Sequence, residues 1–224
     1  MTPQQTIASE PLESSDSVTL GEWFQLNQRW VGIGAIVLLV AGAGTWYYLS
    51  SARLKRENAE RSLSQAKQSL SAGNAALAQS DLQNVVQRYK GTPAGGEAAL
   101  LLAQLDYDQG KYADGLAILR PYSNQSAAGE NLGPIMSLIG DGLNETAKPA
   151  DAADAFRQAA EATPRPGERA LYKAKQARAL MAAGKPADAR TIWQALLDDP
   201  DAVTMHAEAT IRLGELNAKP AGRT

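Results

Sequence analysis

The sequence predicts an all-α protein, in which an N-terminal single transmembrane helix is followed by a short solenoid of helical hairpins. Three observations lead to this prediction. The chain of 224 residues has a long uncharged run near its N-terminus. After residue 55 it is rich in the helix formers Ala, Leu and Gln and poor in β-branched residues, which favours helices over sheets. The pentapeptide KPADA also occurs twice, starting at Lys148 and again 37 residues later at Lys185.

Composition limits the classes of function that the chain can have. The formal net charge is −2 and no run rich in Lys or Arg is present, so nothing indicates a nucleic-acid partner. There is no cysteine, which excludes disulfides and thiolate chemistry. The single histidine, His206, cannot build an ordinary metal site or a histidine-based triad alone. No phosphate-binding or nucleophile-elbow motif occurs. We therefore predict no catalytic site, no metal and no cofactor.

The first 29 residues fall into two segments. Residues 1–17 are polar, contain two prolines and have little to bury, which predicts a disordered tail. Residues 18–29 carry Val18, Trp23 and Leu26 among polar neighbours. This pattern fits an interfacial segment, a short amphipathic helix lying at the membrane surface. An extension of the following helix explains the same residues equally well.

Residues 30–52 are 23 residues without a charge. As a helix they would cover roughly 35 Å, enough for the apolar core of a bilayer. We interpret them as an uncleaved transmembrane helix in contact with lipid. A buried core helix is one alternative. A cleaved signal peptide is another, but the preceding region is long and acidic, unlike a short basic leader. Aromatic residues border membrane spans, and we predict these membrane-interface anchors: Trp23, Trp30, Trp46, Tyr47 and Tyr48.

Basic residues flank the predicted span unequally. Arg29 stands alone before it, whereas five basic residues follow it: Arg53, Lys55, Arg56, Arg61 and Lys67. By the positive-inside rule, this asymmetry would place the large C-terminal part in the cytoplasm.

Residues 53–222 are predicted to form a helical repeat domain of about four hairpins plus a C-terminal capping helix, because a period of 37 residues runs through them. The turns fall at Gly73, Gly110, Ala147 and Gly184. Seven residues before the turns are Ala66, Ala103, Gly140 and Ala177, with Gly214 one period further on. Five residues after the turns are Ala78, Gly115, Ala152 and Ala189, and four beyond these are Leu82, Leu119, Phe156 and Trp193. Small residues let two helices approach closely and the large residue fills the cleft between them. One such hairpin cannot bury its apolar face alone, so the units are expected to stack.

The segments "IGDGL…AKPADAADAFRQAAEATP" and "ARAL…GKPADARTIWQALLDDP" resemble tetratricopeptide repeats, most clearly over residues 134–200. This resemblance implies a tetratricopeptide-like helical-hairpin solenoid as the fold class. In its whole organisation the chain resembles the YfgM-like family, the ancillary subunit of the bacterial SecYEG translocon. This resemblance implies a single-pass protein of the bacterial inner (cytoplasmic) membrane with a periplasmic repeat domain. The implied partners are the translocon subunits and the membrane-anchored chaperone PpiD. We retain this orientation against the flanking charges, because long domains can be translocated despite them.

The predicted function is protein binding. Repeat solenoids bind through the concave surface, so we predict a partner-binding groove from outward positions of the first helices: Gln104, Tyr107, Asp141, Asn144, Arg178, Met181 and Glu215. Their mixed charge favours an extended or partly apolar client segment, or a flat partner domain. The resemblance implies an accessory translocon subunit that assists handover of secreted proteins to periplasmic chaperones. The alternative is a structural scaffold subunit of a respiratory or photosynthetic membrane complex.

Overall fold

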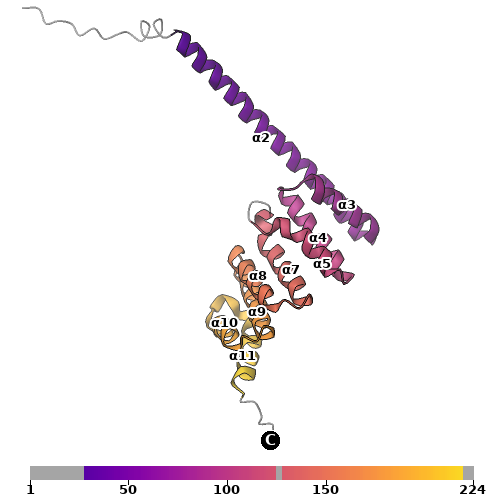
Figure 1. Cartoon of the computed structure of the whole chain (residues 1–224), viewed down its shortest axis with the longest axis vertical. Coiled ribbons are helices and arrows are strands. Elements are labelled where there is room, and N and C mark those ends of the chain that lie inside the picture. Colours follow the sequence, from indigo (N-terminus) through magenta and orange to yellow (C-terminus); the bar gives the residue numbers. More distant parts are fainter. Residues whose placement is uncertain (1–27, 125–127, 219–224) are drawn as a thin grey trace, which may run out of the picture. The chain divides into compact units, whose positions relative to one another are not determined.

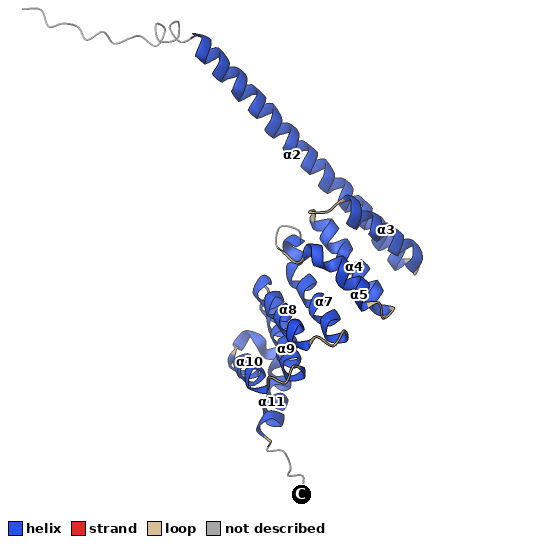
Figure 2. Ribbon diagram, viewed as in Figure 1, coloured by secondary structure: helices blue, strands red, loops and turns tan. Residues whose placement is uncertain are grey.

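A computed structural model describes residues 28–124 and 128–218, and these residues form helices and turns without a strand (Figures 1 and 2). Nine α-helices lie in these ranges: α2 (Gln28–Ser71), α3 (Ala75–Arg88), α4 (Pro93–Asp108), α5 (Tyr112–Leu119), α7 (Leu132–Glu145), α8 (Pro149–Ala162), α9 (Pro166–Ala182), α10 (Pro186–Asp198) and α11 (Val203–Asn217). Short 3-10 helices are η1 (Arg120–Tyr122), η2 (Gly129–Asn131) and η3 (Pro200–Ala202). The predicted tail at 1–17, nearly all of the interfacial segment at 18–29, and Trp23 lie outside the described residues.

Helix α2 runs through the boundary between two compact units, which divide the chain between Ser51 and Ala52. In the first unit, the large apolar side chains described between Trp30 and Leu49 each expose 52–75% of their surface. The predicted anchors Trp30, Trp46, Tyr47 and Tyr48 are among them. No helix within the described residues is both long and apolar enough to cross a membrane, so the transmembrane helix predicted at 30–52 is not confirmed.

In the second unit, consecutive helices pair into hairpins that pack one after another. The C-terminal part of α2 packs with α3, α4 with α5, α7 with α8, and α9 with α10. Helix α11 packs against both helices of the last hairpin. Helices of neighbouring hairpins also touch, as α5 does with α7 and α8 with α9, and Figure 1 shows this succession. The predicted all-α solenoid of helical hairpins is confirmed.

The first helix of each hairpin ends in the same turn. The four turn residues predicted from the 37-residue period have φ values of 74°, 73°, 57° and 73° in chain order. In the first turn, the N–H of Gly73 donates to the carbonyl of Leu70 and that of Asn74 to the carbonyl of Ser69, both at 3.0 Å. This pair of bonds is the Schellman motif, in which a left-handed residue satisfies the last carbonyls of a helix. Among the described non-glycine residues, only Ala147 has a positive φ.

The helix-crossing positions of the repeat are buried as predicted. The alanines at the small-residue positions, from Ala66 to Ala189, are fully buried. Where a first helix carries Gly140 instead, a Cβ would lie 2.6 Å from the ring of Phe156, so only glycine leaves room for that ring. Gly214 of α11 is exposed, and a Cβ there would meet nothing within 4 Å. No second helix follows α11 within the described ranges to cover it.

The core of the second unit consists of three adjoining clusters. Val86 and Ile118 pack against both the N-terminal and the central cluster. Leu143 packs against both the central and the C-terminal cluster. Stacking therefore buries one continuous core along the repeats, which is how such hairpins become stable.

Candidate partner-binding site

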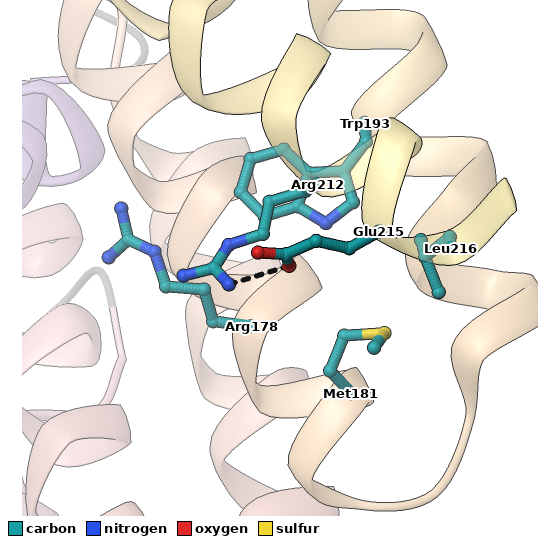
Figure 3. A pocket seen from close by; sticks show the side chains of 6 residues that line it. All are labelled: Arg178, Met181, Trp193, Arg212, Glu215 and Leu216. Atoms are coloured by element: carbon teal, nitrogen blue, oxygen red, sulfur yellow. Dashed lines mark hydrogen bonds and ion pairs between the residues drawn. The ribbon is translucent and has the colours of Figure 1, made fainter. Parts of the chain in front are cut away.

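A cavity of about 200 Å³ lies between α9, α10 and α11, and we call it the α9–α11 cavity. Its lining residues are Arg178 and Met181 from α9, Trp193 from α10, and Arg212, Glu215 and Leu216 from α11 (Figure 3). Three of these, Arg178, Met181 and Glu215, are residues of the predicted groove. Helix α9, the first helix of the last hairpin, and the capping helix α11 therefore supply half of the cavity lining from positions that the sequence pattern marks as outward.

Contacts at both ends hold α11 in place over this cavity. Near its start, the ring nitrogen Nε2 of His206 lies 3.0 Å from the carbonyl oxygen of Asp199. Near its end, the guanidinium of Arg190 on α10 donates to the carbonyl oxygen of Leu216 at 2.6 Å and to the side chain of Asn217. His206 thus has a structural contact, and the cavity wall formed by α11 is fixed to α10.

The charged residues around the cavity form pairs of opposite sign. Arg178 donates to both carboxylate oxygens of Glu208, at 2.7 and 2.6 Å. These hydrogen bonds hold the pKa of Glu208 below its usual value. Arg212 donates to Glu215 at 2.9 Å, the dashed bond in Figure 3, and also lies 3.8 Å from Glu208. Two arginines and two glutamates around the cavity therefore balance in formal charge, although Glu208 itself does not line the cavity.

The interior of the cavity is apolar apart from one buried donor. Met181 is 38% exposed, so the cavity is open to solvent there, and Leu216 is half-buried. Trp193 is fully buried, and its indole N–H has no hydrogen-bond acceptor among the described residues. In Figure 3 the indole nitrogen lies on the ring edge that faces Glu215 and Met181. A buried donor without an acceptor costs about 1–3 kcal/mol and is uncommon in folded proteins.

Two other predicted groove residues, Gln104 and Asp141, line a separate hollow of about 230 Å³ between α4, α7 and α9. Asp141 is held there by Lys175, whose ammonium lies 2.7 Å from its carboxylate. The same ammonium donates to the hydroxyl of Ser137 at 3.1 Å and lies 5.4 Å from the centre of the Phe156 ring. Asp141 thus serves in a bridge between α7 and α9. Five of the seven predicted groove residues therefore line two separate hollows.

Tyr107 does not belong to the groove, and its prediction as an outward residue is wrong. Its side chain is 8% exposed, and its hydroxyl donates to the carbonyl oxygen of Leu138 at 3.2 Å. The ring turns inward because Gly115 and Gly142 leave room for it, and a Cβ on either would lie within 2.4 Å of a tyrosine atom. Burial, and then the charge of Asp141, raise the pKa of Tyr107. Asn144 is exposed on α7.

Sequence reasoning does not identify Trp193, Arg212 or Leu216 as site residues. The repeat pattern marks Trp193 as the large residue that fills the helix cleft, and it does fill it. Whether its N–H meets an acceptor depends on contacts between three helices, which spacing alone does not reveal. For metals, the described part of the chain holds no group of three or more His, Asp or Glu side chains able to bind an ion.

Comparison with known proteins agrees with this architecture. A model of the family described as "Tetratricopeptide repeat-like domain" matches residues 21–218. A crystal structure of the nearly identical TPR-like repeats of a Podosopora anserina protein, described as a putative kinesin light chain, has a TM-score of 0.54. It is 15% identical and covers 71% of this chain and 89% of that one. A crystal structure of a substituted form of the same repeats gives a TM-score of 0.55, 16% identity, and coverage of 71% and 88%. At this identity the likeness concerns the fold alone. No curated protein matches the chain.

Proposed function

The chain belongs to the tetratricopeptide repeat-like domain family, and from this premise we propose that it is an accessory subunit of the bacterial Sec translocon. In this proposal, the repeats bind protein partners and assist handover of secreted proteins to a membrane-anchored chaperone. The observation that carries the protein-binding part is the open α9–α11 cavity, because outward residues of two successive first helices converge in it. Such convergence is how repeat solenoids build a binding surface.

The proposed location is the bacterial inner membrane, with residues 30–52 in contact with lipid. The exposed apolar side chains described between Trp30 and Leu49 support this part, because a large exposed apolar surface needs an apolar environment around it. Trp30 and the aromatic group of Trp46, Tyr47 and Tyr48 are proposed to lie at the two interfaces. The proposed periplasmic position of the repeats depends on the resemblance to the YfgM-like family.

Purification of the full chain in a mild detergent tests the partner. We expect translocon subunits and a membrane-anchored chaperone to co-purify. Stoichiometric recovery of respiratory or photosynthetic subunits would instead support the scaffold alternative. Recovery of the chain without any partner, in cells where the translocon is intact, would contradict both.

The absence of cysteine makes a direct test of orientation simple. The substitution Asn144→Cys places one thiol on an exposed position of the repeat domain. A membrane-impermeant maleimide added to spheroplasts should label this variant before lysis, while the unmodified chain provides the unlabelled control. Labelling only after lysis would show that the repeats face the cytoplasm and that the proposed orientation is wrong.

A further inference from the structure

Of two repeat positions beside the α9–α11 cavity, one carries a charge opposite to that of its equivalent one repeat earlier. Asp141 and Arg178 are equivalent, 37 residues apart, as are Lys175 and Arg212. In the earlier repeat, Lys175 binds Asp141 across two hairpins and covers the ring of Phe156. In the last repeat, the corresponding pair would be Arg178 with Arg212, which repel each other. Each arginine binds a glutamate instead, so Arg178 and Arg212 form no direct bridge like that of Asp141 with Lys175.

The size and the walls of the cavity fit one aliphatic side chain. Its volume of about 200 Å³ exceeds the roughly 150 Å³ of an apolar protein cavity that admits benzene. Met181 and Leu216 supply apolar surface, and the fully buried Trp193 also lines the cavity. The methionine at the mouth is unbranched and flexible, and such side chains adapt to partners of different shape.

The buried indole N–H selects a ligand that also carries a hydrogen-bond acceptor. Trp193 has no acceptor for this group among the described residues, so a bound acceptor would remove an unfavourable contribution to folding. Because the four charges at the rim are already paired, the site does not favour a carboxylate, a phosphate or an ammonium group. A neutral main-chain carbonyl satisfies both conditions.

We propose that the α9–α11 cavity is an anchor pocket for an extended polypeptide segment of a partner protein. One aliphatic side chain of the segment enters the cavity, and the Trp193 indole N–H donates to a main-chain carbonyl oxygen beside it. This proposal rests on the protein-binding role proposed above and specifies the chemistry of the bound segment.

Indole N–H resonances of the full chain in detergent provide the test. The chain has four tryptophans, and the Trp193 resonance is assigned by its disappearance in Trp193→Phe. The probes are the peptide acetyl-Gly-Ser-Gly-Leu-Gly-Ser-Gly-amide and the same peptide with serine in place of leucine. We expect the leucine peptide to shift the Trp193 resonance selectively and the serine peptide to bind at least tenfold more weakly.

Two surface substitutions separate the pocket from the fold. Met181→Asp puts a charge at the mouth and should weaken binding of the leucine peptide at least tenfold. Leu171→Asp is its matched control, because Leu171 lies on the same helix, is 37% exposed and does not line the cavity. It should change binding less than twofold. Thermal melts of both variants show whether the repeat domain stays folded.

Any one of three results would contradict the proposed pocket. These are an unshifted Trp193 resonance at millimolar leucine peptide, equal weakening of peptide binding by both substitutions, and a shift of the Trp193 resonance caused by detergent alone. The last result would identify an acyl chain as the occupant. Partner purification distinguishes the two proposals. Translocon co-purification without any Trp193 shift overturns the pocket and leaves the proposed function standing. A selective shift without translocon subunits supports the pocket and overturns the translocon role.

Discussion

Replacing Ala147 with glycine is expected to stabilise the repeat domain by about 0.5–1 kcal/mol. Ala147 closes α7 with a φ of 57°, the conformation that glycine adopts in the other three turns. An L-residue in this region costs about 1–2 kcal/mol, and glycine removes this cost. Glycine also loses about 0.5–1 kcal/mol more backbone freedom on folding, which reduces the gain. The difference between the two is the expected stabilisation.

Urea denaturation of the full chain, followed by circular dichroism, measures this change from the shift in midpoint at constant slope. Gly110→Ala and Gly184→Ala are the reverse substitutions at equivalent turns. A Cβ at either position would meet nothing within 4 Å, so their effect comes from the backbone alone. Both should destabilise by about 0.5–1 kcal/mol. An unchanged or lower midpoint for Ala147→Gly, together with neutral control substitutions, would refute the reasoning that the left-handed turn limits stability.

Four further substitutions test other contacts. Gly140→Ala should lower stability by about 1–3 kcal/mol in urea denaturation, because the added methyl group overlaps the ring of Phe156. Gly214 is the equivalent position in α11, where a methyl group meets no neighbouring atom. Gly214→Ala should therefore stabilise α11 by up to about 1 kcal/mol. Tyr107→Phe removes a buried hydrogen bond and should cost about 1 kcal/mol in the same assay, and a neutral result would show that the bond is not needed. Glu208→Gln should flatten the acid limb of a pH–stability profile. Because Arg178 lowers the folded pKa of Glu208 below the unfolded value of 4.5, the stabilisation is present above pH 4.5 and is lost as pH falls through the folded pKa. An unchanged acid limb would contradict this coupling.

The repeat could be predicted from sequence because its determinants are local. A left-handed turn residue at Gly73 or Gly184 and a small residue at each helix crossing are dictated by backbone geometry and by the distance between helices. These requirements recur at a fixed interval, so spacing alone reveals them. The fold class and the buried positions follow directly from that interval.

The candidate site could be predicted only in part, because side-chain direction depends on neighbours from other helices. Tyr107 occupies an outward position of the repeat, yet the missing methyl groups of Gly115 and Gly142 let its ring turn inward. Those two glycines were the available signal. Trp193 offers no such signal, since an unpaired indole N–H is recognised only when all three surrounding helices are in place.

The exchange of aspartate for arginine between Asp141 and Arg178 shows how duplicated units can acquire separate roles. The backbone, the turn and the large buried side chain are retained in both units, so the scaffold tolerates the change. One altered charge replaces the direct lysine–aspartate bridge beside Phe156 in the earlier copy with arginine–glutamate pairs near Trp193 in the later one. Arg178→Asp would therefore be expected to let Arg212 close the later site as well. In such an array, a binding site for a partner can arise because one copy lacks a contact that another copy makes, while the fold of both copies stays the same.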